Sequence, residues 1–434
     1  MFVNYINYYF LTLFSLIPLS LILGSSASLI NILLIDLSFL FLLLYLRDFS
    51  FFKDKSFQYL LVFYIYLIFN TLLSEDQAIG ISRNLGFIRI IIFFVAINYF
   101  FKDETFFKKV LFIWIITIII VLFDVCFESF TGKNILGYES IYGRRIVSFF
   151  KDEPIVGGYL NAFYLVLIGF LYYKFRKINK NFILLFSILI LFAIFLTGER
   201  SNTIKAILGI SLFYFFFKEY QLKHKFYLAI GGILIFLSMV FFSDFHKTRY
   251  FLQIKSLILD DKIYFKHYNS AYKIFKENKF FGVGNKNYRI VACSKFREKA
   301  DVINAEYGEP SDVLGSHGPK ADELVGQIEY VCTTHPHQVY FELLSEHGIF
   351  GSIIILYLIY KLILFNFLFR FKELNYIQIG SGIYIILIFL PLIPSGSFFS
   401  DYSITLFALN LAIFYGSNSK FNIFFSHKKD KVKN

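Results

Sequence analysis

Charged side chains are scarce in this sequence of 434 residues. Asp, Glu, Lys and Arg make up 17% of the chain, 57% is hydrophobic, and the mean hydropathy is +0.61. These values lie outside the range of soluble globular proteins and predict a membrane protein. The net charge of +12 does not indicate nucleic-acid binding, because Lys and Arg stand between apolar runs rather than on one basic face.

Several sequence motifs are missing as well. Residues 1–24 have no basic segment ahead of their apolar run, unlike a cleaved signal peptide, so we expect them to remain as the first membrane span. No P-loop or HExxH motif occurs. Residues 282–287, GVGNKN, lack the strand-turn-helix context and third glycine of a dinucleotide fingerprint. We therefore expect no cofactor.

Apolar runs of about 17 to 22 residues, the length that crosses a bilayer core, recur along the chain. They lie near residues 5–24, 27–46, 57–74, 85–101, 106–124, 154–173, 181–197, 203–217, 226–243, 349–368, 376–393 and 399–416. This pattern predicts an all-α polytopic membrane protein with about 12 transmembrane helices and one large outer loop that contains short helices.

The basic residues fall in alternate loops between these runs. By the positive-inside rule those loops and both termini are cytoplasmic, and the other loops face outward. The outward loops include residues 75–84, 125–153, 198–202, 244–348 and 394–398. This topology divides the chain into four parts. Residues 1–243 form the first nine predicted transmembrane helices, and residues 244–348 form a large periplasmic loop domain. Residues 349–416 form the last three predicted transmembrane helices, and residues 417–434 form a basic cytoplasmic tail.

The loop domain has its own pattern. Residues 261–278, DKIYFKHYNSAYKIFKEN, place aromatic side chains at helical spacing with lysines between them, which predicts a helix at the membrane interface. Residues 300–331 read as polar and irregular. In an oxidising compartment, a disulfide between Cys293 and Cys332 would close a loop of about forty residues and contribute roughly 3 to 4 kcal/mol in chain-entropy models. Two free thiols are the alternative.

His335 and His337 stand at the end of this loop domain, in CTTHPHQVYFELLSEHGIFG, residues 332–351. On extended chain, side chains two residues apart point to opposite sides. Three convergent ligands are not visible, so we do not expect a zinc site. The remaining interpretations are a general base and a histidine held at a helix end for structure.

Several arginines lie in the outward loops, although the positive-inside rule assigns most basic residues to the cytoplasmic loops. LTGERSNTIKAILG places Glu199, Arg200 and Lys205 at a tight outer turn, where an arginine is costly unless it is paired or faces a polar cavity. Snorkelling of Arg200 and pairing with Glu199 are the alternatives. Other such arginines are Arg83, Arg144 and Arg145.

Several arginines near one membrane surface are typical of a phosphate or pyrophosphate site. Arg83 and Arg89 lie six residues apart, not on one helix face, so they need not share a ligand. A histidine beside an arginine-lined pyrophosphate site is the arrangement expected of a transferase that uses a lipid-pyrophosphate donor.

Five segments in this order resemble a known family: two arginines before SFFKDEPIVGGYL, then TGERS, FFGVGNKNYR, HPHQVYFELLSEHGIFG and PLIPSGSFFSDYS. They resemble the O-antigen ligase and O-antigen polymerase superfamily of bacterial envelope enzymes, over roughly residues 120–416. The resemblance implies metal-independent glycan transfer from undecaprenyl pyrophosphate at the periplasmic face of the inner membrane. The acceptor is lipid A-core in ligases and another lipid-linked repeat unit in polymerases.

The resemblance also assigns residues. His337 matches the catalytic histidine of the family and Arg200 its outer-turn arginine. A second essential arginine belongs to the long loop, with Arg289 as first choice and Arg249 as second. The other candidates for substrate contacts are Arg83, Arg144, Arg145, Lys205, His267, Lys286 and His335.

A function from a different class is a flippase or transporter for lipid-linked oligosaccharides. A transporter of this kind is expected to have broken helices or charged residues near the membrane midplane. Asp36 is the one charged residue that falls convincingly inside a predicted span.

Overall fold

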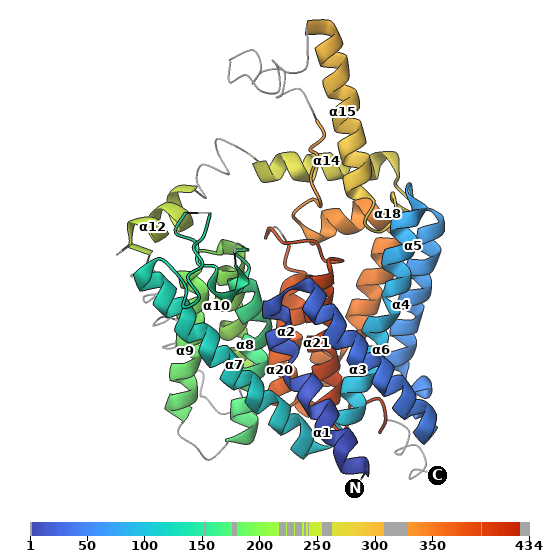
Figure 1. The fold of residues 1–434 in the computed structure, drawn as a ribbon. Coiled ribbons are helices and arrows are strands. Elements are labelled where there is room, and N and C mark those ends of the chain that lie inside the picture. The colour runs from blue at the N-terminus through green and yellow to red at the C-terminus, as the bar shows by residue number, and fades with distance from the viewer. Residues whose placement is uncertain are drawn as a thin grey trace.

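The computed structural model describes residues 2–141, 143–151, 153–175, 180–216, 240–241, 243–253, 263–307, 329–391 and 393–425, with the single residues 223, 230 and 237. Every regular element in these ranges is a helix, as the hydropathy pattern predicted. Most helices pack into one bundle, and two of them, α14 (Ile263–Glu277) and α15 (Tyr288–Tyr307), lie beyond one end of it (Figure 1).

The bundle contains helices of very different lengths. They are α1 (Phe2–Ser15), α2 (Ile17–Leu23), α3 (Ser25–Leu46), α4 (Lys55–Leu72), α5 (Gln77–Gly86), α6 (Ile88–Phe100), α7 (Glu104–Thr131), α8 (Val156–Lys174), α9 (Lys180–Leu196), α10 (Arg200–Phe216), α18 (Val339–Ile359), α19 (Phe365–Phe369), α20 (Tyr376–Ile388) and α21 (Asp401–Gly416). A short helix, α12 (Asp244–Lys247), continues into a π-helical turn, Thr248–Leu252.

Five helical segments of the described chain are long and apolar enough to cross a membrane. They are Ser25–Leu46, Gln77–Phe100, Glu104–Thr131, Val156–Lys174 and Val339–Phe369. A sixth is present if the bent pair α1 and α2 counts as one span. About twelve spans are therefore not confirmed, because hydropathy counts every apolar run whether or not it forms one long helix. Most of the predicted run 226–243 lies outside the described residues.

Helices α8, α20 and α21 form the centre of the bundle. Close approach between α8 and α20 depends on glycines. A Cβ built on Gly169 would lie 2.3 Å from the carbonyl oxygen of Tyr376, and one on Gly380 would lie 2.1 Å from that of Leu165. Small residues at such crossings let helix backbones approach within van der Waals contact. This packing fixes the N-terminal ends of α8 and α21 and the C-terminal end of α20, which carry polar residues described below.

The loops predicted to be cytoplasmic and the loops predicted to face outward lie at opposite ends of the bundle. At one end, the Lys102 ammonium lies 3.8 Å from the Asp48 carboxylate, and the Arg370 guanidinium lies 4.0 Å from the centre of the Phe421 ring. Helix α1 begins at this end, whereas α14 and α15 lie at the other (Figure 1).

Residues 75–84 are largely helical, which corrects the prediction of a loop. The Asp76 carboxylate accepts a hydrogen bond from the Ile79 amide at 3.2 Å and caps α5. The Asn84 side chain is buried and donates to the Leu67 carbonyl at 2.8 Å. Polar residues that read as loop are here satisfied inside the bundle, since each finds a hydrogen-bond partner.

Helix α18 starts well before the predicted span at residue 349. Two carboxylates in its first turns, Glu342 and Glu346, lower the local hydropathy, although both are buried. The helix is kinked at Gly348, whose φ is +64°. A Cβ there would lie 2.4 Å from the backbone of Phe280. The kink therefore lies where the segment that contains Phe280 crosses α18 at close range.

The predicted helix at 261–278 is confirmed as α14, and its basic and aromatic side chains alternate as expected. Helix α15 continues to Tyr307, so residues 300–307 are not irregular as predicted. Residues 308–328 lie outside the described chain.

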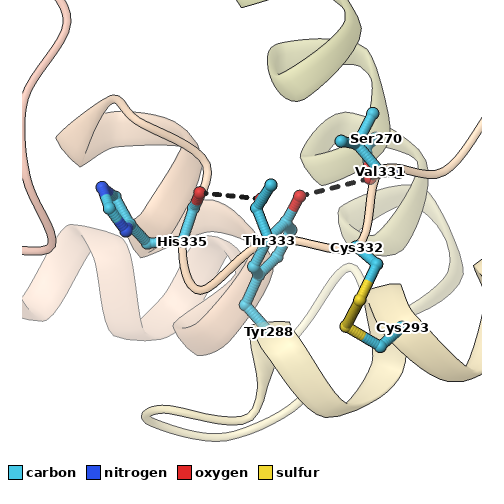
Figure 2. Close-up of a disulfide and its surroundings, with 7 residues drawn as sticks. All are labelled: Ser270, Tyr288, Cys293, Val331, Cys332, Thr333 and His335. Atoms are coloured by element: carbon cyan, nitrogen blue, oxygen red, sulfur yellow. Dashed lines mark hydrogen bonds between the residues drawn. A yellow bond between two sulfur atoms is a disulfide. The ribbon is translucent and has the colours of Figure 1, made fainter. Parts of the chain in front are cut away.

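A disulfide joins Cys293 of α15 to Cys332, where the sequence left a bridge and two free thiols open (Figure 2). Next to it, the Val331 amide donates to the hydroxyl of Ser270 in α14 at 3.1 Å. The Tyr288 hydroxyl reaches the same Ser270 hydroxyl at 3.2 Å. These contacts attach the segment before the histidines to both α14 and α15.

Thiol labelling of the denatured protein tests the disulfide. The chain has three cysteines, and two are joined, so alkylation before reduction should modify Cys126 alone. Alkylation after reduction should modify all three. Intact mass gives the count, and the Cys126→Ser variant should give no modified cysteine before reduction. Three modified cysteines in the unreduced parent would show that Cys293 and Cys332 are free.

Candidate functional site

Three histidines lie together at the end of the bundle that carries α14. The ring centroids of His335 and His337 are 4.2 Å apart, and those of His267 and His337 are 4.8 Å apart. His267 comes from α14, and the other two come from the segment before α18. Two segments separated by about seventy residues in the sequence therefore meet at His337.

The backbone at His337 has a φ of +59°, in the left-handed region that non-glycine residues rarely adopt. The prediction that His335 and His337 point to opposite sides is wrong, because the rule for extended chain does not hold at such a turn. The Ser395 amide donates to the His337 carbonyl at 2.8 Å. Gln338 then caps α18, its side-chain oxygen accepting from the Tyr340 amide at 2.7 Å.

Burial sets the charge state of these imidazoles. It lowers the pKa of His337 from its usual value of 6.5. Burial, with a smaller contribution from His337, lowers the pKa of His267 and of His335 to about 4. All three are therefore neutral at pH 7, and His337 is in the form that accepts a proton. In the described part of the chain, no group of three or more His, Cys, Asp or Glu side chains is arranged to hold a metal ion.

Two buried carboxylates on α18 hold the outer segments around His337. Glu342 accepts from the Ser397 hydroxyl at 2.6 Å and from the Phe398 amide at 2.8 Å. Glu346 accepts from the Lys286 amide at 2.9 Å, and the Lys286 ammonium in turn contacts the Ser397 hydroxyl. Carboxylates four residues apart lie on one helix face. That face therefore anchors two segments that are far apart in the sequence.

Three arginines surround the turn between α9 and α10. Arg249 donates to the Gly198 carbonyl at 3.1 Å, and Arg145 donates to the Pro154 carbonyl at 3.2 Å. Arg200 opens α10, and its Nη1 atom is buried without a hydrogen-bond partner among the described residues. Burial, then repulsion from Arg200 and Arg145, lowers the pKa of Arg249. Three cations this close favour an anionic ligand.

Within the described chain, Glu199 forms no salt bridge with Arg200, so the pairing considered as an alternative role for this arginine is not found. The Glu199 carboxylate instead accepts from the Gly157 amide at 2.6 Å, the Gly158 amide at 3.2 Å and the Asn202 side chain at 2.6 Å. A Cβ on Gly157 would lie 3.0 Å from this carboxylate. Glu199 therefore stabilises the start of α8 and leaves Arg200 available.

Other predicted residues lie apart from these groups. Arg83 pairs with Asp401 at 2.6 Å, and Arg89 binds the second oxygen of the same carboxylate at 2.5 Å. The two arginines share one ion-pair partner, which the helix spacing left open, because their long side chains converge on the Asp401 carboxylate. Arg144 is exposed. Arg289 is exposed in the first turn of α15 and makes no hydrogen bond within the described ranges.

A cavity of about 300 Å³ lies between the arginine turn and the histidine segment. Glu199, Asn202 and Lys205 form part of its wall, and Val339 and Ser395 form another part. Ser395 is the residue whose amide bonds to His337. The cavity thus connects the residue before Arg200 with the residues that hold His337.

Sequence reasoning missed two tyrosines of this cavity, Tyr384 in α20 and Tyr402 in α21. A tyrosine inside an apolar run is usually a core or interface residue. The one available signal was their position beside the PSGS segment between two predicted spans, which does not by itself indicate a site.

The fold and the site together define a multi-pass helical membrane protein with a histidine cluster and an arginine-rich turn on either side of a cavity at one end of its bundle. Residues 184–356 match the family model described as O-Antigen ligase. This match supports the resemblance to the O-antigen ligase superfamily. No curated protein sequence is similar enough to count as a match. The matched segment contains Arg200, Arg249, His267, His335 and His337.

Lowering the pH from 7 to 5 should destabilise the protein through His267 and His335. The pKa of each is about 4 in the folded protein, against about 6.5 for an unfolded histidine. Between these values the unfolded chain binds more protons. Stability that is present above pH 6.5 is therefore lost as the pH falls towards 4. The thermal melting midpoint of the purified protein should fall over this window.

The control is the pair of variants His267→Gln and His335→Gln, whose amides do not titrate. Each should lose less of its melting midpoint between pH 7 and pH 5 than the parent protein. Equal losses in parent and variants would contradict the role given to these two imidazoles.

Proposed function

We propose that the protein transfers a glycan from undecaprenyl pyrophosphate to an acceptor sugar of lipid A-core. The observation that carries this proposal is one cavity whose wall includes Ser395, which bonds to neutral His337, and Glu199, which precedes Arg200. Arg145 and Arg249 lie at the same turn as Arg200. The family match supports a membrane glycosyltransferase of ligase or polymerase type. A repeat-unit polymerase of the same superfamily is the second candidate.

The chemistry follows from these positions. His337 accepts the proton of the acceptor hydroxyl as that oxygen attacks the anomeric carbon of the donor. The bond between this carbon and the pyrophosphate oxygen breaks, and its electron pair leaves with undecaprenyl pyrophosphate. The guanidinium groups stabilise the negative charge that develops there. Because arginines carry this charge, we expect the transfer to be independent of metal ions.

We assign the second essential arginine to Arg249 rather than Arg289. Arg249 bonds to Gly198, two residues before Arg200, and the two guanidinium groups are close enough to shift the pKa of Arg249. Arg289 is exposed on α15 and remains a candidate for contacts with the glycan. Lys286 lies near His335 and helps to hold the outer segments in place.

The proposed location is the bacterial inner membrane, with the site on the periplasmic face. Basic loops lie at the bundle end opposite to α14 and the histidines, and the positive-inside rule assigns that end to the cytoplasm. An undecaprenyl-linked glycan in the outer leaflet would then meet the arginines from the membrane side.

The lipopolysaccharide profile of a deletion strain tests the proposed function. Loss of all capped core, with lipid-linked polymer retained, is the result expected for a ligase. Caps of a single repeat unit would identify the polymerase instead. An unchanged profile in a strain that lacks the protein would reject both.

His337→Ala should abolish glycan transfer, because loss of a general base typically costs about 10²- to 10⁴-fold in rate. Protein abundance in the membrane, measured by immunoblot, should remain normal. Normal lipopolysaccharide from this variant would contradict the role as base. If Asp36→Ala abolished function while His337→Ala retained it, a transporter would be favoured, since Asp36 is buried in α3.

Arg200→Lys should reduce transfer at least about tenfold, because an ammonium cannot make the two-pronged contact of a guanidinium with a pyrophosphate. The matched control is Arg297→Lys, at an exposed position of α15, which should leave transfer unchanged. Transfer rates in membranes of equal protein content give the comparison. Full activity of Arg200→Lys would favour a snorkelling arginine.

A further inference from the structure

The wall of the cavity between the arginine turn and His337 includes two buried hydroxyl groups without a hydrogen-bond partner among the described residues, those of Ser395 and Tyr402. Further polar side chains on this wall are those of Asn161, Lys205, Tyr384 and Ser403. Unsatisfied buried polar groups are rare in folded proteins. Two of them on one cavity wall, beside further polar side chains, point to a ligand.

Asn161 places an amide group beside these two hydroxyls. It lies in α8 at the centre of the bundle, is 3% exposed, and forms part of the cavity wall. An amide donates and accepts hydrogen bonds, as hydroxyls do. Such groups on one wall can satisfy a hydroxyl-rich molecule.

The position of the cavity restricts what this molecule is. On one side it adjoins Glu199, next to Arg200, and on the other it adjoins Ser395, which bonds to His337. A ligand there lies between the groups proposed to bind the pyrophosphate and the group proposed to accept the proton of the acceptor. In a glycosyl transfer, the sugar whose anomeric carbon reacts occupies this place.

The chemistry of the wall, which combines apolar side chains such as Leu387 and Phe398 with amide and hydroxyl groups, favours a sugar over the other parts of the donor. A prenyl chain would match the apolar side chains but leave the buried hydroxyls of Ser395 and Tyr402 unsatisfied. A pyrophosphate would require several cations, but Lys205 is the single cation among the described residues that line the cavity. Amide and hydroxyl groups match sugar hydroxyls, and Tyr384 and Tyr402 supply aromatic rings. A volume of about 300 Å³ falls in the range of ligand pockets.

We propose that this cavity binds the donor sugar that is attached directly to the pyrophosphate. The proposal rests on the proposed function and names the substrate class of the same site. Asn161, Tyr384 and Tyr402 are then residues that recognise the reducing-end sugar. None of the three lies within the segment matched by the family model.

Binding of two lipids to the purified full-length protein tests the proposal. One is undecaprenyl pyrophosphate, and the other is the undecaprenyl-pyrophosphate-linked glycan extracted from cells that produce the protein. Dissociation constants are measured in detergent by titration with native mass spectrometry. Asn161→Ala and Tyr384→Phe should each weaken binding of the glycan-linked lipid about tenfold, the loss of roughly one hydrogen bond. Binding of undecaprenyl pyrophosphate should stay within about twofold.

Controls separate this proposal from the function on which it rests. Tyr384→Phe keeps the ring, and its melting midpoint reports on folding. Tyr45→Phe, at a residue that is 74% exposed, should change neither binding constant. Equal weakening for both lipids would place the pyrophosphate or the prenyl chain in the cavity and overturn the proposal. No weakening for either lipid would mean that only water fills it.

Arg200→Ala should weaken binding of both lipids. If it weakens neither, the arginine site of the proposed function fails, whatever the cavity variants show. If the unaltered protein binds neither lipid, the proposed function and the sugar subsite are both wrong.

Discussion

The Glu342 carboxylate is the group on which the geometry of the site depends. It is buried at 1% exposure at the start of α18, where a carboxyl group without hydrogen-bond partners would be costly. The Ser397 hydroxyl and the Phe398 amide satisfy it, so the segment between α20 and α21 must lie against α18. That segment in turn presents the Ser395 amide to the His337 carbonyl. The position of His337 thus follows from the need to solvate a buried carboxylate.

The same constraint recurs one turn further along α18. Glu346 receives the Lys286 amide, and this contact joins the segment before α15 to the same helix face. Because α15 is tied to Cys332 by the disulfide, the chain on both sides of the loop domain is fixed close to the histidines. Two buried glutamates therefore join the outer segments to α18, in addition to the apolar cluster between α14 and α15, and the cavity lies beside them.

The site separates two electrostatic tasks that would interfere if they shared one place. Cations held close together at Arg145, Arg200 and Arg249 suit an anionic leaving group, but next to the proton acceptor they would oppose the positive charge that it gains. His337 is neutral because of burial, and the cavity separates it from the arginine turn. A sugar ring that spans this distance would bring both ends of the reaction together.

The sequence by itself determined the helical membrane class, the helix at α14 and the family, because long apolar runs, helical spacing and ordered motifs are local properties of the chain. It also singled out His337 and Arg200 as candidates. It could not decide that His335 and His337 lie side by side, since a positive φ at His337 is stabilised by contacts from residue 395. Two further features arise only when helices distant in the sequence pack together: the sharing of Asp401 by Arg83 and Arg89, and the cavity whose wall includes Asn161 and Tyr384.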